Sequence, residues 1–307
     1  MKKAAIIYHR IDFDGICSYA IIRSAFENAG YEAVPFPYNR GDEAPSLAVL
    51  AAFDAVVIAD IALPYDTMSG LLGLAEGCDG FLVEWIDHHK TTIEDSCREG
   101  FDRMNGLRRI GSQGACELCW ERFYAAEPPR AVKLLSAYDT WDRSRFDWEE
   151  ETLPFQYGMR QRYALRADEF LADFWALCSL ESLRSDIVRD GRAILAYARE
   201  SGGKGVKSYG FEVTVGDGHR AVCCLTSQFG GLAFEEALRD AGAAIAVCAN
   251  RLSEDLYNVA MYGIDGVNDL DLGAYLHDNY GGGGHRNAAG ARIDAGQFIR
   301  LITECRI

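Results

Sequence analysis

The sequence has 307 residues, a formal net charge of −15 at pH 7, and 49% hydrophobic against 25% charged residues. Its length suffices for two domains of ordinary size, and its balance is that of a soluble globular protein. No apolar run approaches the roughly 20 residues that a bilayer span needs, so we expect no membrane partner. The negative charge repels the phosphates of long nucleic acid, which argues against long duplex DNA as a partner.

The amino-terminal segment and the cysteines both bear on the compartment. The apolar run that begins at Ala4 meets polar residues after about five positions, too soon for a signal-peptide core of about 7–15. The 10 cysteines show no framework spacing, which favours reduced thiols packed as small hydrophobic side chains. We therefore expect a cytoplasmic protein.

Roughly the first 140 residues alternate short apolar runs with helical patterns. The runs at 3–9, 54–60 and 81–87 predict buried strands, and residues 15–30 predict an amphipathic helix. This alternation is typical of an α/β domain with a mainly parallel sheet.

The second half of the chain has a different pattern. Residues from about 160 to 200 are helical and charged, and the glycine-rich stretch 201–208 predicts a linker. After it, a hairpin turning at residues 216–218, a helix, two strands and a closing helix predict a smaller α/β domain with a mixed sheet. We place a catalytic domain at 1–200 and a substrate-binding domain at 209–307, with a cleft between them.

Ionisable residues follow each expected strand of the first half. Ligands collect at the carboxyl ends of parallel strands. A lone Asp at such a position usually caps a helix, but four clusters at successive strand ends and loops favour a metal centre. Two divalent ions with one bridging carboxylate need about this inventory, and hard donors of this kind suit Mn²⁺ or Mg²⁺. The candidates are His9, Asp12, Asp14, Asp60, Asp87, His88, His89 and Asp139.

Four motifs in chain order carry a family resemblance. They are "HRIDFDG" from His9, "VIADIALP" around Asp60, "DHH" at 87–89 and "AYDTWDR" around Asp139. With the tail "GGGGHRNAAG" at 281–290, the sequence resembles the DHH phosphoesterases, and in particular the nanoRNase or oligoribonuclease-like branch, related to single-strand exonucleases, that carries a Gly-Gly-Gly-His type carboxyl-terminal domain. Many members of that family have one more residue between the first His and the Asp-x-Asp pair than this chain has.

The resemblance implies a role for each motif residue. His9, Asp12 and Asp60 would hold one Mn²⁺, while Asp14, Asp60, His88 and Asp139 would hold a second, with Mg²⁺ as the alternative ion. Asp87 would orient an imidazole, and His89 would donate to the phosphate. A hydroxide bridging the two ions would attack phosphorus without a covalent enzyme intermediate.

The tail motif has donors that suit an anion. Glycines let backbone N–H groups approach a phosphate closely, and a histidine and an arginine add charge-assisted donors. A glycine run by itself is more often a flexible loop, but together with the upstream motifs it favours a substrate contact. The predicted contacts are Gly282, Gly283, Gly284, His285 and Arg286.

These observations predict a manganese-dependent phosphodiesterase that hydrolyses short single-stranded oligonucleotides or small nucleotides to mononucleotides. Hydrolysis of pyrophosphate or polyphosphate is one alternative, and hydrolysis of cyclic dinucleotides or nucleoside bisphosphates is another. A nucleotide-sensing protein without activity is the alternative from a different class. The sequence leaves room for a homodimer.

Overall fold

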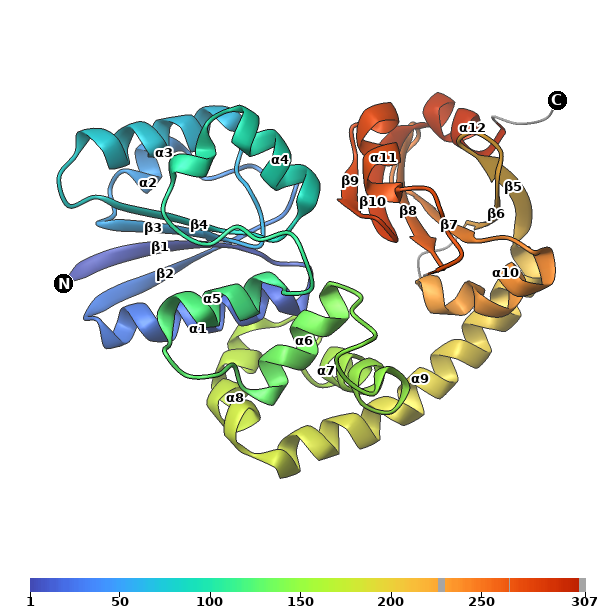
Figure 1. Ribbon diagram of the computed structural model, residues 1–307, viewed down its shortest axis with the longest axis horizontal. Helices are drawn as coiled ribbons and strands as arrows, with labels where there is room; N and C mark the ends of the chain where they lie inside the picture. The colour runs from blue at the N-terminus through green and yellow to red at the C-terminus, as the bar shows by residue number, and fades with distance from the viewer. Residues whose placement is uncertain (226–229, 265, 304–307) are drawn as a thin grey trace. The chain divides into compact units, whose positions relative to one another are not determined.

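The computed structural model describes residues 1–225, 230–264 and 266–303, and the chain forms two compact units, Met1–Ile194 and Leu195–Ile307 (Figure 1). The two units are described separately below. Among the helices described, none is both long and apolar enough to cross a bilayer.

The first unit is built on a four-stranded sheet in the order β2-β1-β3-β4, and every neighbouring pair is parallel. Its strands are β1 (Lys2–His9), β2 (Tyr31–Tyr38), β3 (Ala55–Ala59) and β4 (Leu82–Ile86). All five residues of β3 are buried, as expected for a parallel strand with both faces covered. The predicted parallel α/β architecture is confirmed.

Two layers of helices cover this sheet (Figure 1). Alternate strand residues face opposite layers: Ile6 packs with one and Ile7 with the other. One layer contains α1 (Phe13–Asn28), α5 (Ala115–Phe123), α6 (Arg130–Asp139), α7 (Leu153–Tyr163) and α8 (Ala167–Ser179). The other contains α2 (Leu47–Leu50), α3 (Tyr65–Gly77), α4 (Lys90–Arg98) and the 3₁₀ turn η1 (Phe101–Arg103). A short π-helical turn, η2 (Trp148–Thr152), precedes α7.

Strand β2 was not expected from the sequence. It contains Pro35 and Pro37, which cannot donate backbone hydrogen bonds and argue against a central strand. The structure accommodates them because β2 lies at the edge of the sheet and pairs only with β1.

The second unit is built on a six-stranded mixed sheet in the order β5-β6-β7-β8-β10-β9. Among the strand pairs in the described ranges, β6–β7 is parallel and the others are antiparallel. The strands are β5 (Phe211–Val215), β6 (His219–Cys224), β7 (Ile245–Arg251), β8 (Leu256–Gly263), β9 (Gly283–His285) and β10 (Ala288–Asp294). The predicted hairpin at 216–218 joins β5 to β6, and the predicted mixed sheet is confirmed.

Helices cover both faces of this second sheet. α11 (Leu272–Tyr280) and α12 (Ala295–Thr303) pack on one face. The 3₁₀ turn η3 (Gly231–Phe234) and α10 (Glu235–Ala241) pack on the other.

The stretch 201–208, expected as a linker, is helical. It lies within α9 (Glu181–Tyr209), which continues through the three glycines of this stretch. Val206 is 2% exposed and packs in the core beside α10. Tertiary packing of this kind outweighs the low helix propensity of glycine.

Candidate metal centre

The carboxyl edge of the first sheet gathers the predicted metal ligands. His9 ends β1, Asp12 caps the start of α1, and Asp60 directly follows β3. The helix after β1 covers one face of the sheet and the helix after β3 covers the other. The ligands therefore lie where neighbouring strands send their connections to opposite faces, which is where open α/β sheets bind ligands.

Asp60 lies at the centre of this group. Its Oδ2 is 3.5 Å from His9 Nδ1, whereas its Oδ1 is 3.2 Å from His88 Nε2. The side chain is buried, and within the described part of the chain neither carboxylate oxygen has a hydrogen bond of good geometry. A buried carboxylate in that condition is costly unless a cation accompanies it. With one oxygen facing each donor set, Asp60 has the arrangement of a bridging ligand.

The backbone of Asp60 is also unusual. Its φ is +63°, in the left-handed region that Asp and Asn tolerate better than other non-glycine residues. The amide donates to the Ile86 carbonyl at 2.9 Å, which holds the residue beside the end of β4. Such backbone strain is concentrated at functional sites.

The first donor set consists of His9, Asp12 and Asp60, whose ligand atoms lie within 4.8 Å of one another. His9 Nδ1 is 2.6 Å from Asp12 Oδ2, and His9 Nε2 is 3.2 Å from the Asn39 side-chain oxygen. A proton on Nε2 would bond to Asn39 and leave Nδ1 for a cation. The short spacing between His9 and Asp12 thus still brings both side chains to this set.

Asp12 has two roles in the structure. Its Oδ1 accepts a hydrogen bond from the Gly15 amide at 2.9 Å and so caps α1, while its Oδ2 faces His9. A Cβ atom on Gly15 would lie 2.0 Å from the His9 carbonyl oxygen, so the glycine is required for this close approach. The capping and ligand interpretations of the Asp-x-Asp-Gly motif are therefore compatible.

The second donor set consists of Asp14, Asp60 and His88. His88 Nε2 is 3.4 Å from Asp14 Oδ2 and 3.1 Å from Oδ2 of Asp139, the last residue of α6. The side chains of His88 and Asp14 are completely buried, and that of Asp139 is 22% exposed. All the predicted ligands of the second ion are thus close together.

Electrostatics in the two sets favour the binding of positive charge. Burial and the nearby carboxylates of Asp60 and Asp139 raise the pKa of Asp14 well above its usual range. Burial opposes the protonation of His9, but the carboxylates of Asp12 and Asp60 raise its pKa to about 11. Protons therefore supply the balancing charge in the metal-free protein, and divalent cations would displace them.

The amino terminus of α5 holds Asp14. The Ala115 and Cys116 amides donate to its carboxylate at 2.7 and 2.9 Å. Gly114, which precedes this helix, has no side chain with which to cap it, and a Cβ atom there would lie 2.8 Å from Asp14 Oδ1. Asp14 thus caps a helix from a different part of the chain, a contact that sequence reasoning missed.

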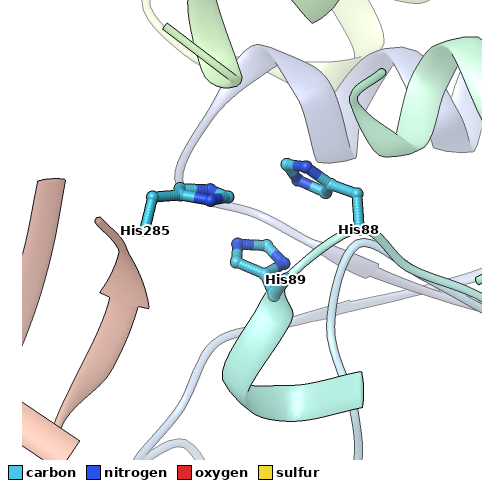
Figure 2. Close-up of side chains that lie close together, drawn as sticks. All are labelled: His88, His89 and His285. Atoms are coloured by element: carbon cyan, nitrogen blue, oxygen red, sulfur yellow. The ribbon is translucent and has the colours of Figure 1, made fainter. Parts of the chain in front are cut away.

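Asp87 orients the turn that follows β4. Its Oδ1 accepts from the amides of His88 and His89 at 2.7 and 3.0 Å, and from His89 Nδ1 at 2.8 Å. Burial favours the neutral acid, but the charges of His89 and His88 lower the pKa of Asp87. Figure 2 shows the two imidazoles projecting from this turn, and their ring centroids are 4.4 Å apart. Because Asp87 accepts from Nδ1 of His89, it fixes the orientation of that ring.

The end of α6 fixes Asp139. The Asp142 amide donates to the Ala137 carbonyl at 2.9 Å, a helix termination in which the residue before Asp142 adopts a left-handed conformation. That residue is Trp141, with φ +56°, where glycine is usual. Its ring packs edge-on against Trp148, with centroids 4.9 Å apart, so aromatic packing offsets the backbone cost.

The predicted substrate contacts of the second unit lie around β9. The Gly281 and Gly282 amides donate to the carbonyls of His277 and Leu276 and so end α11. A Cβ atom on Gly282 would lie 2.4 Å from the Gly290 carbonyl oxygen, and one on Gly284, whose φ is +140°, would lie 2.6 Å from the Ala288 carbonyl oxygen. Much of the glycine run thus serves tight packing between a helix and a hairpin.

Two charged or polar residues complete the tail motif. His285 ends β9 and is partly exposed, and the exposed Arg286 donates to the Asp269 carbonyl at 3.0 Å. The Gly282 amide is thus engaged in ending α11, and Gly283, Gly284 and His285 form β9, which pairs with β10. Their role as substrate contacts stays a prediction.

The donor sets fit a pair of divalent cations. Asp60 belongs to both, every donor is a carboxylate or an imidazole, and both carboxylate oxygens of Asp60 are buried. This chemistry suits Mn²⁺ or Mg²⁺ better than soft metals. Asn39, which contacts His9, and Gly114, which leaves room for Asp14, were not identified from the sequence because they are distant along the chain from these two residues.

The fold and this donor set define a two-unit α/β protein with a candidate metal centre at the edge of its parallel sheet. Neither a family model nor a curated protein matches the sequence. Solved structures do match. A DHH domain from a protein assigned to a family of ribosomal proteins is 13% identical over 98% of this chain and 85% of that chain, with a TM-score of 0.60. RecJ from Thermus thermophilus, solved in complex with Mn²⁺, is 13% identical over 98% of this chain and 51% of that chain, with a TM-score of 0.50. The chain has the fold of the DHH-domain proteins.

Proposed function

We propose that this protein is a metal-dependent phosphodiesterase that hydrolyses short single-stranded oligonucleotides or small nucleotides to mononucleotides. One observation carries the proposal: the two oxygens of Asp60 face two separate donor sets, one with His9 and Asp12 and the other with His88 and Asp14. This arrangement suits two ions that share one carboxylate, as in many phosphoryl-transfer enzymes. Mn²⁺ is the proposed ion, with Mg²⁺ as the alternative, and the RecJ neighbour was solved with Mn²⁺.

The chain's own residues have distinct roles in this proposal. When bound, two divalent ions lower the pKa of a coordinated water and offset the charge of a phosphate. Asp87 accepts from Nδ1 of His89 and fixes the ring, so that the imidazolium form of His89 can donate from Nε2 to a phosphate oxygen as negative charge develops. Asp14 and Asp12 are each held by backbone amides, so these carboxylates need little rearrangement on binding.

The substrate class rests on the tail motif and on charge. His285 and Arg286 provide donors suited to a second phosphate or a nucleotide. The net charge of −15 disfavours long polyanions, which supports short substrates. Pyrophosphate, polyphosphate, cyclic dinucleotides and nucleoside bisphosphates remain the enzymatic alternatives.

A product-resolved substrate panel tests the proposal. The purified protein with Mn²⁺ would be given a two-to-five-nucleotide RNA, a nucleoside bisphosphate, a cyclic dinucleotide and pyrophosphate in parallel. We expect the oligonucleotide to be cleaved to mononucleotides at the highest kcat/KM. Faster hydrolysis of pyrophosphate would favour the phosphatase alternative, and binding of nucleotides without any hydrolysis would favour a sensor.

A further inference from the structure

Glu117 and Arg145 form a partly buried ion pair that is not part of the second donor set. Glu117, in the first turn of α5, is 4% exposed. Its Oε1 and Oε2 accept from the two terminal nitrogens of Arg145, both at 2.8 Å. Oε2 also accepts from the Ser136 hydroxyl at 2.7 Å. A bidentate pair with a third hydrogen bond is a rigid arrangement.

This pair is connected to Asp14 through the start of α5. The Ser136 oxygen accepts a hydrogen bond from the Gly114 amide at 2.8 Å. The next two amides, of Ala115 and Cys116, are those that hold the Asp14 carboxylate. The position of the Asp14 oxygens thus depends on how the first turn of α5 is held.

The same pair is connected to Asp139. Ser136 lies on α6 one turn before Asp139, so a bond that fixes Ser136 also fixes the last turn of that helix. Arg145 also donates to the Ser112 carbonyl at 3.1 Å, which ties the loop after α6 to the loop before α5. Among the hydrogen bonds described, none joins Glu117, Arg145 or Ser136 to His9 or Asp12, whose side chains bond to Asn39 and Gly15.

We propose that Glu117, Arg145 and Ser136 are positioning residues that set the separation of Asp14 and Asp139 and thereby the affinity of one cation of the pair, the one beside His88. The inference rests on the metal centre of the proposed function. A network with only a structural role would lower stability without favouring either cation. Selective loss of one binding event is therefore the informative result.

Calorimetric titration with Mn²⁺ of the metal-free protein tests this proposal. Glu117→Gln keeps the size of the side chain but removes the charge that Arg145 needs. We expect the affinity of one binding event to fall by about 10–100-fold, as for other residues that orient metal ligands, and the other to be unchanged. Asp12→Ala, which removes a ligand of the first donor set only, identifies which event is which.

Glu121→Gln is the matched control. Glu121 lies one turn later on α5 and forms a bidentate pair with Arg109 at 2.8 and 2.9 Å, but both side chains are exposed. Its replacement should leave both binding events unchanged. Ser136→Ala removes only the hydroxyl that links Gly114 to Glu117, and it should weaken the same event as Glu117→Gln.

The outcomes separate the inference from the proposed function. Equal weakening of both events, or of neither, in folded Glu117→Gln or Ser136→Ala protein would overturn the inference. Circular dichroism establishes that each variant is folded, and Ser136→Ala decides the matter if Glu117→Gln does not fold. Since the titration uses no substrate, a selective effect supports the inference even if the substrate panel shows no hydrolysis.

Discussion

The two donor sets that share Asp60 differ in burial and in how they are held. On one side, His9 and Asp12 are 15% and 25% exposed, Asn39 contacts the imidazole, and the Gly15 amide holds the Asp12 carboxylate. On the other, His88 and Asp14 are fully buried, and two amides at a helix start hold the Asp14 carboxylate. Preorganised ligands lose less freedom on binding, so we expect the cation beside His88 to bind more tightly and to exchange more slowly.

The largest expected effect comes from the residue common to both sides. Asp60→Asn should abolish uptake of both cations and lower the hydrolysis rate by more than about 10³-fold, above the loss of a single transition-state donor. Asn also tolerates a positive φ, so the fold should survive. Metal analysis and initial rates check this. Asp54→Asn is the control, because Asp54 accepts from the Lys3 amide at the opposite end of β3. Near-normal metal uptake in Asp60→Asn would contradict a shared ligand.

Replacing His89 tests whether the two histidines after β4 have different roles, with His88 binding metal and His89 contacting the substrate. His89→Ala should keep both cations and lower kcat by about 10²–10³-fold, because it removes a donor to the phosphate. Metal content and turnover of the same preparation are measured together. If this variant lost metal to the extent that His88→Ala does, His89 would have to be reassigned as a ligand.

Replacing His88 separates the two donor sets, because His88 belongs to the set with Asp14 and not to the set with His9 and Asp12. His88→Ala should weaken the tighter binding event by more than about 100-fold, since a lost ligand costs more than a lost orienting group. The weaker event should remain, and Asp12→Ala should show the reverse pattern. Titration with Mn²⁺ distinguishes the two variants. Identical titration curves would mean that the two sides bind as a single unit.

The smallest expected effect concerns the second unit. His285→Ala should lower kcat/KM for a short oligonucleotide by about 10-fold or more, since a charge-assisted hydrogen bond contributes about 1.5–3 kcal/mol. A minimal aryl phosphodiester should be hydrolysed at nearly the wild-type rate. Steady-state kinetics with both substrates measure this difference in kcat/KM. Equal slowing of the two reactions would remove the main reason for preferring an oligonucleotide over pyrophosphate as the substrate.

The sequence indicated which ionisable side chains meet at the sheet edge better than it indicated which residues hold them in place. Asp60 and His88 follow continuous apolar strands, so their placement at one sheet edge follows from local pattern and from the geometry of parallel sheets. Gly114, Glu117 and Arg145 have no such pattern, because their partners lie on other elements: Gly114 and Glu117 both bond to Ser136 on α6, and Arg145 reaches Glu117 from the loop after α6. From the sequence alone, a glutamate in the first turn of a helix is explained by its favourable interaction with the helix dipole. Its role in an ion pair becomes visible only when its partner is known.

The fold itself was predicted where hydrophobicity dominates and was missed where backbone chemistry or packing overrides composition. β1, β3 and β4 were found because they are buried on both faces. β2 was missed because its prolines argue against a strand. The helix at residues 201–208 was missed because its glycines predict a linker, whereas the packing of Val206 in the core, which stabilises the helix, is not evident from the sequence. β2 and residues 201–208 differ from β1, β3 and β4 in that contacts with neighbouring elements, rather than the local pattern of hydrophobic residues, determine their secondary structure.

The prolines of β2 also bear on how the protein behaves at high concentration. Pro35 and Pro37 are two residues apart, so their nitrogens face the same side of the strand, and because they cannot donate, the ladder to β1 uses the residues between them. The outer edge of the sheet thus lacks two donors that an added strand would need. The opposite edge, β4, is covered by residues 105–108, with bridges from Glu84 to Asn105 and from Asp87 to Arg108. Neither edge of the parallel sheet offers a template for strand addition, so fibrillar aggregation should not begin there.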